Sequence, residues 1–179
     1  MFERIERSGL GIFEHGIVST DQIVFSKQAR DFCERNVCRN YGTTWACPPA
    51  VGSMEACVQI CLSNRLVLVF SAKYDMVDSF DFDGMMVAHK KFKTVCDKLY
   101  EVLLQESRDF ILLSNESCIR CNECNYPASP CRFPDLLFPA VEGYGILVSE
   151  LAKSSGIHYS NGVNTVTYFG AVLFDRVNN

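Results

Sequence analysis

The stretch Phe110-Ile-Leu-Leu113-Ser-Asn-Glu-Ser-Cys118-Ile-Arg-Cys121-Asn-Glu-Cys124 joins a short apolar run to three cysteines, each separated by two residues. Four consecutive bulky apolar residues are typical of a buried strand. Because this run leads almost directly into Cys118, we expect the cysteines to lie where a strand ends, at the edge of a sheet.

The segments before this stretch predict further helices and strands. Residues 12–25 read as a strand, a turn and the entry of a helix, and residues 53–63 read as a short helix with Ser53 as its N-cap. Arg65 to Phe70 is a second buried strand. From Met85 to Leu103 the apolar residues keep close to a 3.6-residue period, which predicts a long amphipathic helix.

The segments after the cysteines complete the pattern. Apolar residues recur every three or four positions from about 138 to 154, before Gly156, and predict a helix over that range. Thr165 to Phe174 is β-branched and aromatic and predicts a strand, with Gly170 as a bulge. The resulting fold class is α/β, with α+β as the alternative: a single sheet flanked by helices, with cysteine-rich metal-binding loops at its edge.

Composition narrows the range of functions. With 179 residues, 48% of them apolar, the chain is expected to form a single domain over residues 1–179. A net charge of −4 without a basic stripe argues against nucleic acid as a partner, and no apolar run is long enough for a membrane span. The N-terminal residues carry no apolar signal-peptide core, so we expect a cytoplasmic protein with reduced thiols. A homo-oligomer is left open.

The segment 118–134 is a ferredoxin-like cysteine loop. Cys118, Cys121, Cys124 and Cys131 form a Cys-x2-Cys-x2-Cys-x6-Cys run, and three prolines in the same segment prevent a helix. Zinc sites usually pair two Cys-x2-Cys knuckles across a longer loop, so this spacing favours an iron-sulfur cluster, with zinc as the alternative. The spacing departs from the ferredoxin run at its fourth cysteine, which follows after six residues rather than three.

A looser set of cysteines occupies the first cysteine-rich segment, residues 33–61. Its centre is the loop from Cys38 to Cys47, which Pro48 and Pro49 follow. Cys57 and Cys61 are four residues apart on one face of the expected helix, so both thiols could point at a metal or both at the core.

Four pieces of this sequence together resemble a known family. The pieces are Tyr41-Gly-Thr-Thr-Trp45-Ala-Cys47-Pro-Pro49, the Cys118 to Cys131 run, Glu142-Gly-Tyr-Gly145-Ile146 and Thr165-Val-Thr-Tyr-Phe-Gly170. The chain is similar over about residues 30–175 to the predicted metal-binding proteins of anaerobic bacteria and archaea that are grouped as domain of unknown function 2284. The resemblance implies a cysteine-rich iron-sulfur protein, and it names no substrate.

The resemblance also implies the ligands of a first metal site. They would be Cys33, Cys38 and Cys47, with Cys57 as the fourth ligand and Cys61 as its competitor. Cys96, in contrast, lies on the apolar face of the long helix with no cysteine near it in sequence, and we expect it to be core. Glu142 is explained by its place at the start of a helix, and we expect Trp45 to be a core aromatic rather than a lid over a cluster.

These observations favour a redox protein that holds one or two [4Fe-4S] clusters and exchanges electrons with a partner protein. Two alternatives stay open. One is an iron-sulfur enzyme with a substrate-accessible iron, and the other is a zinc-stapled structural or binding module without a redox role. No catalytic residue can be assigned, and whether the chain is an enzyme stays undecided.

Overall fold

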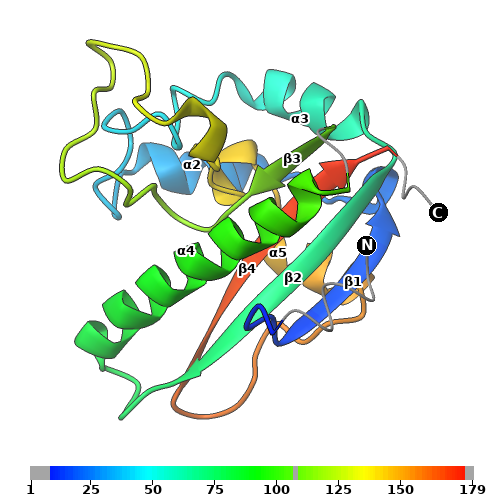
Figure 1. The fold of residues 1–179 in the computed structure, drawn as a ribbon, viewed down its shortest axis with the longest axis vertical. Coiled ribbons are helices and arrows are strands. Elements are labelled where there is room, and N and C mark those ends of the chain that lie inside the picture. The colour runs from blue at the N-terminus through cyan, green and yellow to red at the C-terminus, as the bar shows by residue number, and fades with distance from the viewer. Residues whose placement is uncertain (1–8, 107–108, 176–179) are drawn as a thin grey trace.

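The computed structural model describes residues 9–106 and 109–175 (Figure 1). Within these residues one sheet contains four strands in the order β1-β2-β4-β3, and every neighbouring pair is antiparallel. The strands are β1 (Glu14–Ser19), β2 (Leu66–Asp75), β3 (Phe110–Leu113) and β4 (Thr165–Phe174). The short strand β3, which precedes the cysteine loop, therefore lies at one edge of the sheet.

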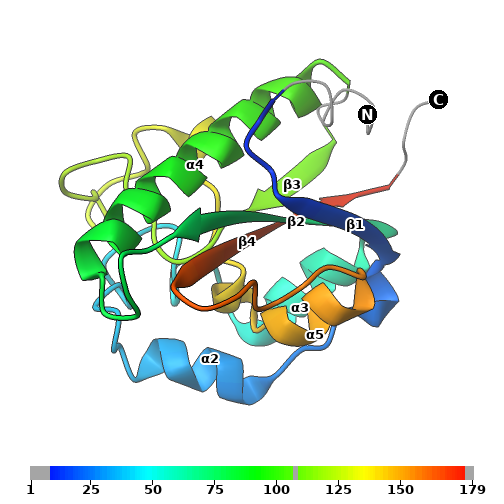
Figure 2. The same cartoon turned by 90° about the horizontal axis from the view of Figure 1, so that it is seen from below.

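Helices cover both faces of the sheet, as Figure 2 shows. The long helix α4 (Phe82–Leu104) lies on one face, and α2 (Lys27–Glu34), α3 (Met54–Leu62) and α5 (Val148–Ser154) lie on the other. Three 3-10 turns complete the described elements: η1 (Thr20–Gln22), η2 (Pro134–Leu136) and η3 (Glu142–Tyr144). The architecture is mixed α/β with a single sheet, as predicted.

The sheet separates two apolar cores because successive side chains of a strand point to opposite faces. In β2, Val67 and Val69 belong to the core under α3 and α5, whereas Leu68 and Phe70 belong to the core under α4. All four side chains are at most 1% exposed. This central strand thereby anchors both helical layers.

Several expected elements are confirmed. Ser53 is the N-cap of α3, where its hydroxyl accepts a hydrogen bond from the Ala56 backbone N–H at 3.2 Å. The long amphipathic helix is present as α4, and Asp81 caps its start. The strand expected over residues 65–70 continues to Asp75, because it pairs with β4 along its whole length.

The single helix expected over residues 138–154 was wrong. The segment forms η3 and the shorter α5, and the chain breaks between them at Gly145, which has a φ of 74°. Such a left-handed conformation is readily adopted by glycine. A Cβ at this position would also lie 3.0 Å from the terminal methyl carbon of Met54, so the break allows α3 to approach closely.

The expected bulge at Gly170 was also wrong. Gly170 pairs in regular register with Phe70, and the ladder continues on both sides of it. A Cβ at Gly170 would lie 2.3 Å from Cζ of Phe70, so the glycine leaves room for that ring.

In the described residues, no helix is both long and apolar enough to cross a bilayer.

Candidate metal centre

All ten cysteines are free thiols, and eight of them were candidate ligands. The four cysteines of the loop after β3 line one small cavity together with Trp45. We call Cys118, Cys121, Cys124 and Cys131 the loop set. Each of these residues is half-buried, and all four border the same space.

Trp45 ties the loop to the first cysteine-rich segment. Its indole Nε1 donates a hydrogen bond to the Ser129 carbonyl at 3.1 Å, and its ring meets the Tyr126 ring edge-on with centroids 4.9 Å apart. Trp45 is partly exposed and is not part of either core. The expectation that Trp45 is a core aromatic was therefore wrong, because its ring covers one side of the thiol cavity.

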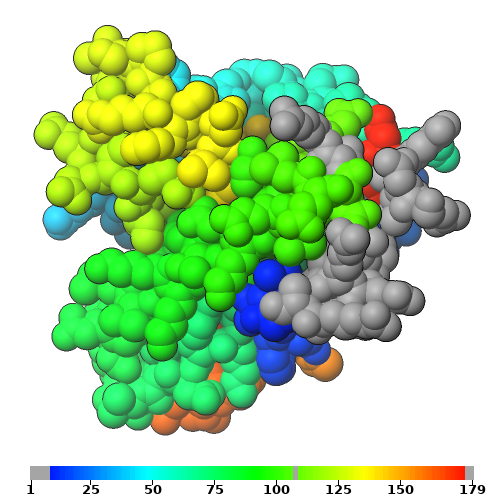
Figure 3. All heavy atoms as spheres, viewed as in Figure 1, coloured from blue at the N-terminus to red at the C-terminus, as the bar shows by residue number. Residues whose placement is uncertain are grey.

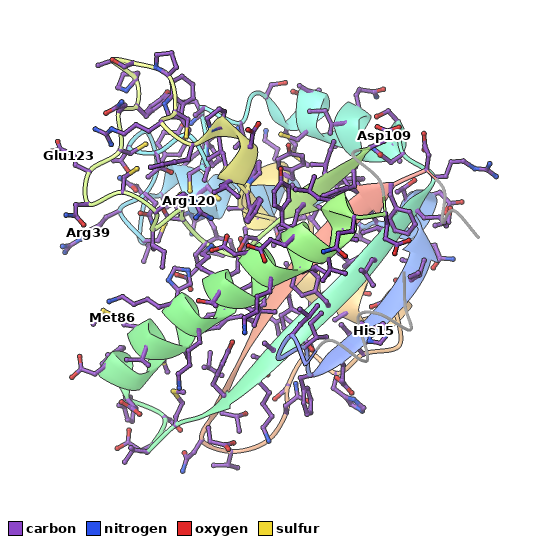
Figure 4. All side chains as sticks on the ribbon, in the orientation of Figure 1. His15, Arg39, Met86, Asp109, Arg120 and Glu123 are labelled. Atoms are coloured by element: carbon purple, nitrogen blue, oxygen red, sulfur yellow. The ribbon has the colours of Figure 1, made fainter. Side chains whose placement is uncertain are left out.

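Arg120 ties the other side of the loop to α4. Its guanidinium forms an ion pair with Asp97 at 2.5 Å and donates to the Leu136 carbonyl at 3.3 Å. In Figure 4 Arg120 lies between the loop and the body of the molecule, whereas Glu123 lies at the loop's outer edge. The space-filling view shows the loop as a lobe beside α4 (Figure 3).

The charges around Cys118 suit a thiolate. Burial raises the pKa of the Cys118 thiol, while Lys93 and Arg120 act in the opposite direction. The Lys93 ammonium is nearly buried at the end of β3, where it donates to the Ser114 hydroxyl at 3.0 Å and to the Asn115 carbonyl. These two cations would offset part of the negative charge of a bound thiolate centre.

The donor set fits a soft metal. Thiolate ligands select zinc, copper(I) and iron-sulfur clusters. The cavity between the thiols measures about 20 Å³, and in the described residues no three acidic, histidine or cysteine side chains are arranged to hold an ion. A single ion would need the thiols to draw together, and an iron-sulfur cube would need the loop to open.

A second set of thiols lies in a larger pocket of about 730 Å³. Cys33 reaches it from α2, and Cys38 and Cys47 reach it from the loop after α2. We call these three residues the pocket set. They differ in burial, since Cys47 is buried, Cys33 is half-buried and Cys38 is exposed.

Arg30 fixes the helix that carries Cys33. Its buried guanidinium donates to the Gly143 carbonyl and, at 2.5 Å, to the Gly52 carbonyl. These bonds join α2 to η3 and to the turn before α3. Since Cys33 follows Arg30 by three residues, its thiol is held on the same side of the helix.

A carboxyl group faces the pocket set. Glu142 lines the same pocket and accepts a hydrogen bond from the Glu116 backbone N–H at 3.2 Å. Burial raises the pKa of the Cys33 thiol to about 11, and Glu142 and Cys47 contribute in the same direction. Burial also raises the pKa of Glu142. Metal binding here would have to displace the Cys33 proton.

The structure does not bring Cys57 or Cys61 into this pocket. Both thiols are fully buried in the core beneath the sheet, and Cys57 donates to the Val51 carbonyl at 3.4 Å. Burial raises the pKa of Cys57 and raises that of Cys61 to about 12. Cys96 is equally buried, as expected, 3.3 Å from the Ser114 hydroxyl. Glu142 therefore lines the pocket together with the three thiols, and Cys57 does not.

The two sets of thiols meet at one short segment. The Cys47 thiol lies 4.0 Å from the Glu116 carbonyl oxygen, and Glu116 precedes Cys118 by two residues. In Figures 1 and 2 the loop before α3 and the loop after β3 run side by side. The pocket set and the loop set are therefore neighbours across residues 114–118.

Sequence reasoning missed two polar residues of this region, Lys93 and Arg120, and it explained Glu142 by its place at the start of a helix rather than by the pocket. A lysine three residues before Cys96, on the edge of a buried helix face, is a signal that could have identified Lys93. Arg120 lies inside the cysteine run itself. Nothing local marks Glu142, because its approach to Cys33 depends on how α2 packs against η3.

Comparisons with known proteins agree with the cysteine pattern. The model of one family, described as predicted metal-binding protein (DUF2284), matches residues 16–174. That range contains all of the cysteines in both sets. Neither the curated proteins nor the solved structures contain a match to this chain.

Proposed function

Because the chain belongs to the DUF2284 family of predicted metal-binding proteins, we propose that its loop set holds a [4Fe-4S] cluster that exchanges electrons with a partner protein. The observation that carries this proposal is the convergence of Cys118, Cys121, Cys124 and Cys131 on one cavity. When bound, such a cluster takes up and releases one electron at a time. The protein's residues hold the cluster, set its surroundings and offer a surface to the partner.

Three residues would influence the reduction potential of a cluster at this site. Lys93 and Arg120 place positive charge near Cys118, and the Trp45 indole limits access of water to the thiols from the side of the first cysteine-rich segment. Cations and hydrogen bonds near cluster sulfurs raise the reduction potential, whereas solvent exclusion and net negative charge lower it. The proposal includes the cytoplasmic location expected from the sequence, because a reducing compartment keeps thiols available for a metal.

The pocket set supports a second metal group, with Cys33, Cys38 and Cys47 as ligands. Since Cys57 lies outside the pocket, this group would have three thiolates and an open position that faces the cavity. That arrangement favours the iron-sulfur enzyme with a substrate-accessible iron as a second candidate function. Here the chain would contribute the three thiols, with the Glu142 carboxyl group in the same pocket.

One observation favours zinc as the alternative for the loop set. A cavity of about 20 Å³ has roughly the room of a single water molecule. Four thiolates around one zinc ion would close this cavity with less movement than a cube requires. The protein would then be a zinc-stapled structural or binding module.

The deciding experiment measures iron, acid-labile sulfide and zinc per chain after strictly anaerobic purification. One cube corresponds to about four iron and four sulfide per chain, and two cubes to about eight of each. Zinc without sulfide would overturn the electron-transfer proposal and leave the zinc module.

Matched variants assign the metal to its ligands. We expect Cys121→Ser to remove the iron and sulfide of the loop set and Cys33→Ser to remove those of the pocket set. Cys96→Ala is the control, because this buried thiol faces Ser114 rather than either cavity. Replacing Cys57 and Cys61 together by alanine should leave the metal content unchanged. If it removes a cluster instead, the open-position candidate fails.

A further inference from the structure

The pocket that contains Cys33, Cys38 and Cys47 is much larger than three thiols and a metal group need. Its volume of about 730 Å³ lies within the roughly 300–1,000 Å³ of small-molecule sites. Its lining includes residues of α2 and residues 167–169 of β4. In Figure 2, α2 lies on the side of the sheet opposite α4. The thiols occupy the part of the wall that α2 and the following loop provide.

Aromatic and aliphatic side chains form most of the remaining wall. Tyr159 and Phe169 stack with their ring centroids 5.4 Å apart and 17° between the planes. Tyr41 also lines the pocket, and Phe32 does so from α2 with 62% of its surface exposed. Flat rings of this kind favour a ligand with an aromatic body, which can stack on them or meet them edge-on.

The charged side chains that line the pocket are acidic. Glu116 and Glu142 line the pocket, whereas no lysine, arginine or histidine is among the described residues that line it. Lys93 approaches the same segment from behind, where its ammonium donates to Ser114 and to the Asn115 carbonyl. The pocket therefore offers acceptors for a cation or an N–H donor and no cation for an anionic group.

A buried amide without a hydrogen-bond partner belongs to a residue of the pocket wall. Asn115 lines the pocket and is 3% exposed, and neither its Oδ1 nor its Nδ2 has a hydrogen-bond partner among the described residues. Leaving a buried amide unpaired costs roughly 1–3 kcal/mol, so a ligand that pairs with it would recover that energy. An amide has a donor beside an acceptor, and its best complement is a group that also presents both.

We propose that this pocket is a binding site for a neutral or cationic aromatic small molecule that bears a hydrogen-bonding amide or amine group. The aromatic body would lie on the Tyr159–Phe169 pair, and the polar group would reach Asn115 and the two glutamates. This site goes beyond the proposed metal centre, since it rests on the apolar walls, the charge pattern and Asn115 rather than on any bound metal.

Three indole compounds of similar shape test the charge and amide requirements. Binding of indole-3-acetamide, tryptamine and indole-3-acetate to the anaerobically purified protein is measured by titration calorimetry. We expect the amide and the amine to bind at least tenfold more tightly than the carboxylate. Equal binding of all three, preference for indole-3-acetate or no binding by any of them would overturn the proposal.

Variants locate the binding. Ala29 lines the pocket from α2, so Ala29→Phe should weaken binding of the amide and the amine at least tenfold, whereas Gln28→Phe on the exposed side should not. Asn115→Leu should weaken indole-3-acetamide more than tryptamine. It should not lower the melting temperature, because an apolar residue of the same shape replaces an unpaired amide. Equal binding by Ala29→Phe and the unchanged protein would place the ligand elsewhere.

Measuring the metal content distinguishes a failure of indole binding from a failure of the proposed cluster. Iron and sulfide are counted in each sample used for calorimetry. A normal metal content with no indole binding would overturn the pocket proposal alone. Indole binding by a protein without iron or sulfide would sustain the pocket and overturn the cluster.

Discussion

Arg30 is the residue whose surroundings most directly connect the core to the pocket set. Its buried guanidinium holds the carbonyl groups of Gly143 and Gly52, and Cys33 lies one turn further along the same helix. A change at this position is therefore expected to affect stability and the position of Cys33 together.

We predict that Arg30→Met destabilises the protein by about 2–4 kcal/mol, because it leaves two buried carbonyl oxygens without donors. Urea unfolding at pH 7 measures the change. Arg35→Met on the exposed end of α2 is the control, and it should cost less than about 0.5 kcal/mol. A variant at Arg30 that unfolds at the same urea concentration as the parent would show that the two hydrogen bonds contribute nothing net.

His89 makes stability depend on pH. Its side chain is 14% exposed and faces Lys93 on its own helix, Glu116 at 3.8 Å and the Tyr168 ring at 5.7 Å between centroids. Burial, with Lys93 acting in the same direction, lowers the pKa of His89 to about 4. The unfolded chain takes up this proton near pH 6.5, well before the folded chain does.

Because the unfolded chain binds this proton more readily than the folded chain does, the folded state loses stability as pH falls from about 6.5 to about 4. This residue should account for up to about 3 kcal/mol of that loss. His89→Gln cannot take up the proton, so its unfolding free energy should fall less over this range than that of the parent. Chemical unfolding at several pH values measures both slopes, and parallel slopes would contradict the burial of a neutral imidazole.

At the scale of elements, Gly170 leaves the space on β4 into which the Phe70 ring of β2 extends. A Cβ there would lie 2.3 Å from Cζ of Phe70 and 3.0 Å from the Leu113 carbonyl oxygen. Phe70 in turn stacks on Phe92 of α4, with centroids 5.7 Å apart. The glycine thereby makes room for a ring that packs between the sheet and its long helix.

Gly170→Ala should destabilise the protein by about 1–3 kcal/mol through overpacking. The double variant Phe70→Leu with Gly170→Ala should cost less than the sum of the two single changes, because the smaller side chain frees the space that the methyl group needs. Urea unfolding of all four proteins gives the coupling. Additive effects would mean that the strands separate slightly instead of competing for that space.

Elements with a strong local pattern were predictable from the sequence, and those set by packing were not. The apolar period of α4 and the Ser53 cap of α3 depend on neighbouring residues alone, and both are present. The break at Gly145 depends on how closely Met54 approaches, and the role of Gly170 depends on Phe70 in another strand. Neither approach leaves a mark on the local sequence.

In the candidate site, too, local spacing could be read from the sequence, whereas contacts made by tertiary packing could not. The spacing of Cys118, Cys121 and Cys124 predicts ligands of one metal centre; this stays a prediction, and in the structure the three residues line one cavity. Two residues near that cavity come from elsewhere in the chain: Trp45 lines it, and the Lys93 charge acts on Cys118, both through tertiary packing. Cys57 could not be assigned from the sequence, because a helix position four residues from Cys61 suits a core and a ligand equally.

At the scale of the whole molecule, the loop set stands apart from both apolar cores. None of its four cysteines belongs to either core, and among described residues Trp45, Arg120 and Ser129 supply contacts that join the loop to the body. The sheet and its helices bury their apolar surfaces without the loop. Metal binding should therefore order the loop rather than drive folding of the sheet.

Trp45 makes this separation measurable, because it is the single tryptophan of the chain and its ring covers the thiol cavity. We predict that removing the metal with a chelator changes Trp45 fluorescence and exposes the loop to proteases, while the far-UV circular dichroism is kept. The melting temperature followed by dichroism should fall by no more than roughly 5 °C, the equivalent of about 1–2 kcal/mol at this size. With metal bound, fluorescence and dichroism should report one transition, as the single domain expected from the sequence requires. Cys121→Ser should resemble the chelated protein before any chelator is added. Loss of the dichroism signal on chelation would instead mean that the metal supplies folding energy to the whole chain, as it does in zinc fingers.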